Sequence, residues 1–154
     1  MMRIALHQPD IPQNAASIVR LAACLGVGVD VIEPCGFLLG DRYFRRAGMD
    51  YIDQATITRH ASFAAFCAQM PTGARKVLLS TRADLPHFAF VFAADDVLLL
   101  GRESGGVPED VHAAADARVR IPMRPGLRSL NVAVAAAIVL GEALRQTGGF
   151  KDLA

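Results

Sequence analysis

The stretch VLLLGRESGGVPED, residues 97–110, decides the fold. Its first part, VLLLG, is a continuous apolar run, which is typical of a strand buried within a parallel sheet. The loop GRESGGVPED contains three glycines, which permit tight turns and let the backbone approach a ligand closely. Pro108 then stands where proline is favoured, in the first turn of a short helix. A strand, a glycine-rich loop and a helix in this order predict one unit of an α/β fold.

The same alternation of strands and helices extends outward over the rest of the chain. Further strands are predicted at Arg3–His7, Val29–Ile32, Lys76–Ser80 and Arg118–Ile121, and further helices at Asn14–Leu25, residues 61–70 and Val132–Gln146. Asn14 and Asn131 are the predicted N-caps, and Gly26 is the predicted end of the first helix. We therefore predict a single α/β domain over residues 1–154, with a mostly parallel sheet flanked by helices.

The composition indicates a soluble protein that pairs with itself. Hydrophobic residues make up 53% of the chain, and the mean hydropathy is +0.32. Such values are high for a small protein, so we expect apolar surface to be buried against a second copy in a homodimer. No apolar run approaches the roughly 20 residues that span a bilayer, and the N-terminus does not read as an export signal. The expected location is the cytoplasm.

The three cysteines do not indicate a disulfide framework or a metal site. Cys24, Cys35 and Cys67 are odd in number and form no C-x-x-C pair. We expect them to be small buried hydrophobic residues, and we expect no bound metal.

The positive charge is carried almost entirely by arginine. The formal net charge is only +1, so overall charge does not indicate a nucleic-acid-binding protein. The arginines gather in two clusters, one of Arg42, Arg45 and Arg46 and one of Arg118, Arg120, Arg124 and Arg128. A guanidinium group suits phosphate, although a GC-rich genome would also favour arginine, so composition leaves phosphate binding open.

Three loops are candidates for a ligand site, because ligands of parallel α/β sheets bind beyond the carboxyl ends of the strands. These loops follow Ser80, Leu100 and Ile121. The glycine-rich loop matches neither a dinucleotide-binding fingerprint nor a phosphate-binding P-loop nor the G-x-S-x-G nucleophile motif. Taken alone, it reads as an ordinary turn.

Three motifs taken together carry a family resemblance. They are N-x-x-x-x-x-R from Asn14 to Arg20, L-x-G-x-E-x-x-G-x-P from Leu99 to Pro108, and I-P-M-x-x-x-x-R-S-L-N from Ile121 to Asn131. In this order and spacing the chain resembles, over essentially its whole length, the SPOUT superfamily of S-adenosylmethionine-dependent RNA methyltransferases. The segments IPQNAASIVRLA, VIEPCGF and DRYFRRAGMDY are similar to its minimal tRNA (cytidine(34)-2'-O)-methyltransferase branch, which has no appended RNA-binding domain. Relatives usually carry glycine at the position of Ala16.

The resemblance implies a C-terminal trefoil knot whose loops bind S-adenosylmethionine largely through backbone groups. The implied cofactor contacts are Leu79, Gly101, Ile121 and Ser129, with Met123 and Leu130 lining the adenine or methionine pocket. The implied reaction is methylation of the ribose 2'-OH of the wobble nucleotide, cytidine or modified uridine at position 34, in leucine tRNAs. Two alternatives stay open: 2'-O-methylation elsewhere in tRNA or in ribosomal RNA, and a noncatalytic RNA-binding α/β module.

The resemblance also implies roles for polar residues. The catalytic set is Arg20, Asn14, Glu103 and Asn131. The charge of Arg42, Arg45 and Arg46 predicts that this cluster binds the tRNA backbone, the alternative being a solvated surface, and Arg128 is a further candidate for contact with RNA. A guanidinium stays protonated at ordinary pH, so we expect Arg20 to orient the 2'-oxygen and a nearby phosphate rather than act as a base. Asn14 would hold Arg20 or the ribose, and Glu103 would fix the loop or neighbouring arginines. Arg128 would meet either an RNA phosphate or Glu103.

Overall fold

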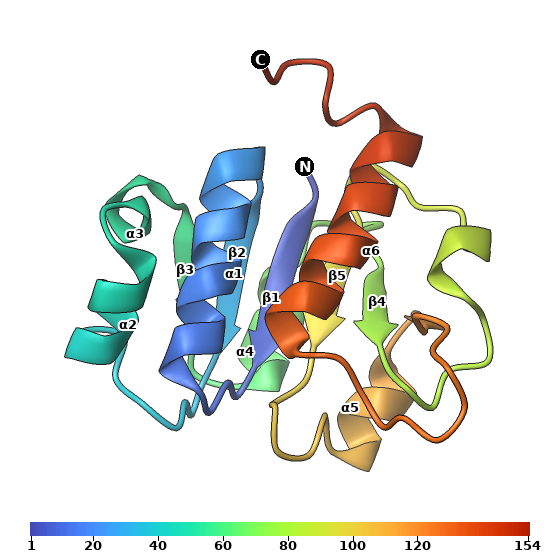
Figure 1. Ribbon diagram of the computed structural model, residues 1–154, viewed down its shortest axis with the longest axis horizontal. Helices are drawn as coiled ribbons and strands as arrows, with labels where there is room; N and C mark the ends of the chain where they lie inside the picture. The colour runs from blue at the N-terminus through green and yellow to red at the C-terminus, as the bar shows by residue number, and fades with distance from the viewer.

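A six-stranded, all-parallel sheet forms the centre of the molecule. The computed structural model describes the whole chain, residues 1–154. The strand order is β3-β2-β1-β5-β4-β6, and every pair of neighbours is parallel. The strands are β1 (Arg3–His7), β2 (Gly28–Ile32), β3 (Ile57–His60), β4 (Lys76–Leu79), β5 (Val97–Leu100) and β6 (Ala117–Val119). In Figure 1 the strands point toward one edge, where the connecting loops gather, and both chain termini lie at the opposite end. The predicted α/β class and parallel sheet are confirmed.

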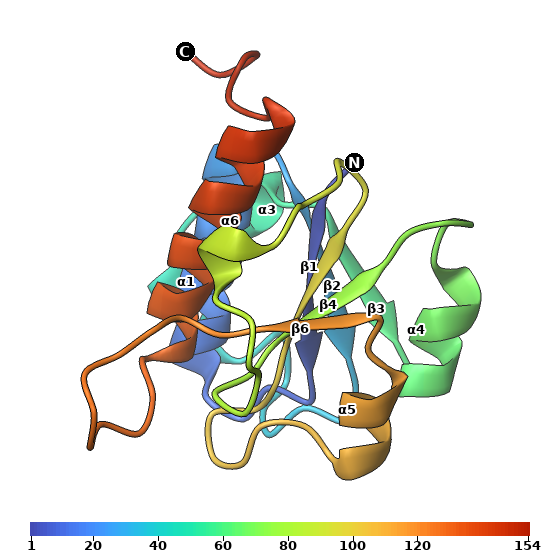
Figure 2. The same ribbon diagram turned by 90° about the vertical axis from the view of Figure 1, so that its right-hand side faces the viewer.

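Helices cover both faces of this sheet. They are α1 (Pro12–Leu25), α2 (Arg42–Gly48), α3 (Tyr51–Gln54), α4 (Phe63–Gln69), α5 (Glu109–Ala114) and α6 (Val132–Thr147), with a short 3-10 turn, η1, at His87–Ala89. Figure 2 shows α1 and α6 on one side of the sheet and α4 and α5 on the other. Side chains along β5 alternate between the two faces of the sheet. Leu98 and Leu100 pack in the core under α1 and α6, and Leu99 packs in the core under α4 and α5.

The first helix starts earlier than predicted. Pro12 occupies the first turn and Ile11 is the N-cap, so the prediction of Asn14 as N-cap is wrong. Proline suits the first turn because its fixed φ matches a helix and its missing N–H has no partner to lose there. Asn14 is therefore a helical residue whose side chain is available for other contacts. Gly26 ends the helix at a φ of 67°, as predicted.

The last helix starts where predicted. The Asn131 side chain accepts hydrogen bonds from the backbone N–H groups of Ala133 and Val134 at 2.9 and 3.2 Å, so Asn131 is the N-cap. α6 lies beside α1 on the same face of the sheet (Figure 1). This arrangement brings the helix that contains the first motif next to the helix that follows the third motif.

The basic segment 41–55 folds into two short helices that the hydrophobic pattern does not reveal. Asp41 caps α2 by accepting hydrogen bonds from the N–H groups of Tyr43 and Phe44. Phe44 is buried, whereas Arg45 and Arg46 are exposed. α2 and α3 both pack against α1.

The segment after β6 runs alongside the loop that follows β4. The N–H of Arg120 donates to the carbonyl of Leu85, and the N–H of His87 donates to the carbonyl of Arg120, at 2.9 and 2.8 Å. The chain then passes through residues 121–131 into α6 (Figure 2). No helix has the length and apolar character needed to cross a membrane.

The three cysteines are free, and one of them does not follow the expected burial. Cys24 is exposed on α1, and Cys35 and Cys67 are partly buried. The expectation of full burial is therefore wrong, most clearly for Cys24, which lies on the outer face of its helix.

Candidate functional site

A large cavity opens at the carboxyl ends of three adjacent strands. Its volume is about 630 Å³, and the loops that follow β4, β5 and β6 all line it. These are the three loops predicted to bind a ligand, because they follow the carboxyl ends of parallel strands. Asn14 on α1 and the start of α6 complete the wall.

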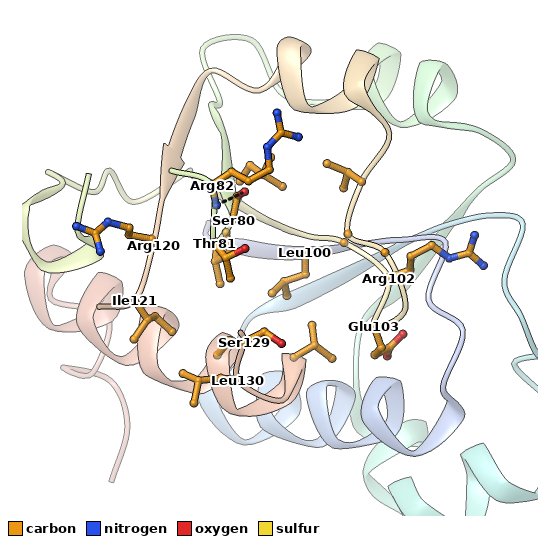
Figure 3. Close-up of a pocket in the computed structure, with 18 of the residues that line it drawn as sticks. Ser80, Thr81, Arg82, Leu100, Arg102, Glu103, Arg120, Ile121, Ser129 and Leu130 are labelled. Carbon is orange, nitrogen blue, oxygen red and sulfur yellow. Dashed lines mark hydrogen bonds between the residues drawn. The ribbon is translucent and has the colours of Figure 1, made fainter. Parts of the chain in front are cut away.

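The centre of the cavity is apolar and its rim is basic. Figure 3 shows Leu100, Ile121 and Leu130 around the hollow. The guanidinium groups of Arg82, Arg102 and Arg120 extend outward from it (Figure 3), and Arg82 is paired with Glu109 at 3.0 Å. An apolar cavity with a few polar groups is the usual form of a small-molecule site.

Gly101 places two stretches of backbone in close contact. A Cβ atom at this position would lie 2.5 Å from the carbonyl carbon and 2.7 Å from the Cα of Gly106. Gly106 itself has a φ of +66°, a conformation that favours glycine. The strand that enters the loop and the chain that leaves it therefore pass too closely for a side chain. This contact shapes the wall of the cavity.

Asp10 and Glu103 join two loops at the edge of the cavity. The N–H of Asp10 donates to Glu103 Oε2 at 3.1 Å, and the N–H of Glu103 donates to Asp10 Oδ1 at 3.2 Å. Ser104 Oγ donates to the other Asp10 oxygen, and Arg102 Nε lies 3.6 Å from that oxygen. These contacts join the loop after β5 to the loop after β1, which the motifs do not indicate. They agree with one of the two roles expected of Glu103, that of holding the loop.

The two carboxyl groups differ in their acidity. Hydrogen bonding with Glu103 is the main cause that lowers the pKa of Asp10 to about 2. Burial is the main cause that raises the pKa of Glu103. Asp10 therefore loses its proton at a lower pH than Glu103 does, and its carboxylate lies next to the Arg102 guanidinium.

Asn14 and Asn131 meet across the cavity wall. Asn131 Nδ2 donates to Asn14 Oδ1 at 3.0 Å. The two residues are 117 positions apart in sequence, and the pairing of α1 with α6 brings them together.

The structure brings most of the predicted site residues into this cavity. Those that line it are Asn14, Leu79, Gly101, Glu103, Ile121, Met123, Arg128, Ser129, Leu130 and Asn131. Arg128 lines the cavity and forms no ion pair, and the Glu103 carboxylate accepts a hydrogen bond from the N–H of Asp10. Of the two contacts expected for Arg128, the one to Glu103 is therefore not seen.

Arg20 lies outside the cavity of its own chain. Its guanidinium carbon is 4.6 Å from the centre of the Tyr51 ring, and its Nη1 is 3.8 Å from the sulfur of Met49. Arg20 and Asn14 are six residues apart, which places them about 120° apart around α1. Asn14 therefore does not hold Arg20 within one chain.

The basic cluster of α2 also lies outside the cavity. Arg42 stacks on the Tyr43 ring at 5.0 Å, and Arg45 pairs with Asp53 at 3.5 Å. All three arginines of the cluster, Arg46 included, are exposed. No group of three or more His, Cys, Asp or Glu side chains is arranged to hold a metal ion.

The three sequence motifs do not include two residues that contact predicted site residues in the structure. Asp10 lies in the loop just after the buried strand β1, so the rule that ligands bind beyond the carboxyl ends of parallel strands points to it. Tyr51 lies in the basic segment after α2, and only its contact with Arg20 identifies it.

Comparison with known proteins shows which family shares this arrangement. The SpoU rRNA Methylase family matches residues 1–141. The chain belongs to this family. The SPOUT resemblance carried by the three motifs is thereby confirmed.

Individual relatives are similar to this SpoU methylase in sequence or structure over nearly its whole length. A tRNA (cytidine(34)-2'-O)-methyltransferase of Beijerinckia indica subsp. indica is 66% identical over 146 residues, which cover 94% of this chain and 91% of that one. A solved structure described as "Structural insights into the 2-OH methylation of C/U34 on tRNA" has 43% identity and a TM-score of 0.91, with 95% of each chain covered. The SpoU methyltransferase AviRb from Streptomyces viridochromogenes, solved in complex with the cofactor AdoMet, has 28% identity and a TM-score of 0.87. That match covers 94% of this chain and 57% of that chain.

Proposed function

We propose that this protein transfers a methyl group from S-adenosylmethionine to the ribose 2'-oxygen of nucleotide 34 in tRNA. The observation that carries the proposal is the cavity at the ends of β4, β5 and β6, lined by the second and third motifs. Support for the substrate comes from the name of the 66% identical relative and from the description of the structural relative with 43% identity.

The cavity fits S-adenosylmethionine in size and in chemistry. Its volume of about 630 Å³ lies within the range of roughly 300–1,000 Å³ that is usual for small-molecule sites. Leu79, Ile121 and Leu130 offer apolar surface for an adenine ring or a methionine chain. Gly101 and Gly106 line the cavity, so no side chain separates their backbone N–H and C=O groups from a ligand. We propose these residues, with Met123 and Ser129, as the cofactor contacts.

The cofactor supplies a methyl group on a positively charged sulfur, and transfer breaks that carbon–sulfur bond while a bond forms to the 2'-oxygen. The protein must hold the 2'-oxygen in line and give its proton a route away. The Arg20 guanidinium remains protonated and donates hydrogen bonds to the 2'-oxygen and to a neighbouring phosphate. The proton then leaves to that phosphate or to water.

We propose that the active unit is a homodimer in which Arg20 serves the partner's cavity. Arg20 points away from the cavity of its own chain, toward Tyr51. The outer face of α6 leaves Val134 and Ile138 48% and 39% exposed. Apolar side chains on an uncovered helix face suit an interface with a second copy.

We also propose the path of the RNA. Arg42, Arg45 and Arg46 on α2, together with Arg128 at the cavity, bind phosphates of the tRNA backbone. α2 packs on α1, the helix that carries Arg20. The α2 cluster of a subunit therefore lies on a helix next to the one that carries Arg20.

Two further expectations belong to this proposal. The segment 120–131 passes through the loop after β4 as a trefoil knot, and the pairing of Arg120 with Leu85 and His87 on that loop supports this path. The protein acts in the cytoplasm, where its tRNA substrate is found.

Total tRNA and labelled S-adenosylmethionine test the proposed function. Incubation with the purified protein should place the label on the 2'-oxygen of nucleotide 34, with leucine tRNAs as the expected isoacceptors. The labelled nucleotide is identified by nuclease digestion and mass spectrometry. Label on a base, on another tRNA position or only on ribosomal RNA would overturn the proposal.

A further inference from the structure

The orientation of the Asn131 side chain is fixed by the helix that it caps. Its Oδ1 accepts hydrogen bonds from the N–H groups of Ala133 and Val134. A reversed amide would place its NH2 group against these two donors, which is unfavourable. The oxygen therefore faces α6, and the NH2 group faces away from the helix.

This orientation determines that of Asn14. The outward NH2 group of Asn131 donates to Asn14 Oδ1 at 3.0 Å. The oxygen of Asn14 is thus occupied, and its own Nδ2 takes the opposite position. No group of the protein accepts a hydrogen bond from Asn14 Nδ2, although Asn14 is partly buried and lines the cavity. Two N–H donors therefore remain on Asn14 at the edge of the cavity.

We infer that Asn131 is a positioning residue that acts through Asn14, and that Asn14 Nδ2 binds a ribose or phosphate oxygen of the nucleotide being methylated. The inference rests on the proposed function. An RNA backbone offers mainly acceptor oxygens, so a fixed donor at this edge matches its chemistry. The chain of contacts runs from the α6 backbone through Asn131 to Asn14 and then to the substrate.

The cap and the orienting contact can be separated by substitution. Aspartate at position 131 still caps α6, because its carboxylate accepts from the same N–H groups. It has no NH2 group, so Asn14 would turn its own NH2 group toward the carboxylate and present its oxygen to the RNA. That oxygen would face acceptor oxygens of the substrate. Alanine at position 131 removes both the cap and the contact.

The experiment compares Asn131→Asp, Asn131→Ala and Asn14→Asp with the wild type. For each protein, thermal unfolding, the Kd for S-adenosylmethionine, and kcat and KM for tRNA are measured. We expect Asn131→Asp to keep the wild-type Tm and a cofactor Kd within about twofold, while kcat/KM for tRNA falls about 100-fold, because polar groups are left facing each other. Asn131→Ala should lose both stability and activity. Asn14→Asp should keep its contact from Asn131 and still lose activity.

Each other outcome overturns the inference. If Asn131→Asp methylates tRNA as fast as the wild type while Asn131→Ala does not, Asn131 serves only as a helix cap. If Asn131→Asp binds the cofactor as poorly as it methylates tRNA, Asn131 belongs to the cofactor site. Failure of the proposed function is a separate result, because it would appear in the wild type as the absence of label on nucleotide 34.

Discussion

The Arg20 guanidinium is held by two neighbouring side chains, Tyr51 and Met49. The guanidinium carbon lies 4.6 Å from the centre of the Tyr51 ring, and the Nη1 atom lies 3.8 Å from the sulfur of Met49. A cation over an aromatic face gains about 0.5–1 kcal/mol at an exposed site. Tyr51 therefore holds the Arg20 guanidinium outside the cavity of its own chain. In the dimer that we propose, Arg20 acts on a substrate bound to the partner subunit.

Substitution of either residue should reduce catalysis and leave the fold intact. Arg20→Lys should lower kcat by roughly 100-fold, because an ammonium group cannot hold two oxygens with a planar fork. Tyr51→Ala should raise KM for tRNA, whereas Tyr51→Phe, which keeps the ring, should not. Steady-state kinetics give these values, and thermal unfolding serves as the control. Near-normal turnover by Arg20→Lys would show that no guanidinium is needed.

The Asp10–Glu103 pair gives the stability of the protein a defined dependence on pH. The pKa of Asp10 is lowered to about 2 in the folded chain. Its charge therefore stabilises the fold above its ordinary pKa, and this contribution is lost as the pH falls toward 2. Burial raises the pKa of Glu103, so ionisation of Glu103 acts in the opposite direction as the pH rises above its ordinary value.

Replacement of Asp10 isolates the first effect. Asp10→Asn should lower the free energy of unfolding by on the order of 1 kcal/mol near pH 6. The difference from the wild type should shrink as the pH falls from 4 to 2. Urea unfolding at several pH values measures it. A difference that stays constant over this range would mean that the Asp10 charge does not contribute.

At the scale of elements, buried strands were the easiest to predict. β1 and β5 are short apolar runs, and their predicted bounds agree with the structure to within one residue. The sequence alone misplaces the start of α1, because Asn14 is a good cap residue and Pro12 competes with it for the first turn. The hydrophobic pattern does not reveal β3, because only His60 of its four residues is buried.

The candidate site was predictable to the extent that strand ends and motifs define it. The glycine-rich loop and the loop before α6 line one cavity, as expected for neighbouring carboxyl ends. The position of Arg20 outside that cavity was not predictable. The spacing of Arg20 from Asn14 shows only that the two side chains point in different directions from α1. Which of them faces the cavity depends on how α2, α3 and α6 pack around α1.

The loop after β5 provides a matched pair of glycine substitutions. A Cβ at Gly101 would collide with the backbone of Gly106, whereas a Cβ at Gly105 meets nothing within 4 Å. Gly101→Ala should therefore displace the loop and raise the Kd for S-adenosylmethionine tenfold or more, a loss of about 1.4 kcal/mol or more in binding free energy. Gly105→Ala should bind as the wild type does. Calorimetric titration measures both, and equal affinities would contradict the proposed role of the loop.

At the scale of the whole molecule, the uncovered face of α6 is expected to form the dimer interface. Ile138→Asp should place a charge in that interface and yield monomers that fold but do not methylate tRNA. Val91→Asp is the control, because Val91 is 78% exposed on a loop. Analytical ultracentrifugation gives the oligomeric state. Fully active monomers would contradict the dimer.

A mixture of two inactive variants tests whether the subunits share a site. Arg20→Ala and Asn131→Asp, refolded together, should form mixed dimers in which one of two sites is intact. Random pairing would then restore about a quarter of wild-type activity. If Arg20 acts within its own chain, the mixture should remain as inactive as the separate variants.

The most direct test of the central claim uses a leucine tRNA transcript with a single 2'-deoxynucleotide at position 34. This change removes one hydroxyl group and keeps the base, the phosphates and the tRNA shape. Methylation of the unaltered transcript and no label on the deoxy transcript are the predicted results. Equal labelling of the two transcripts would contradict methylation at the 2'-oxygen of nucleotide 34.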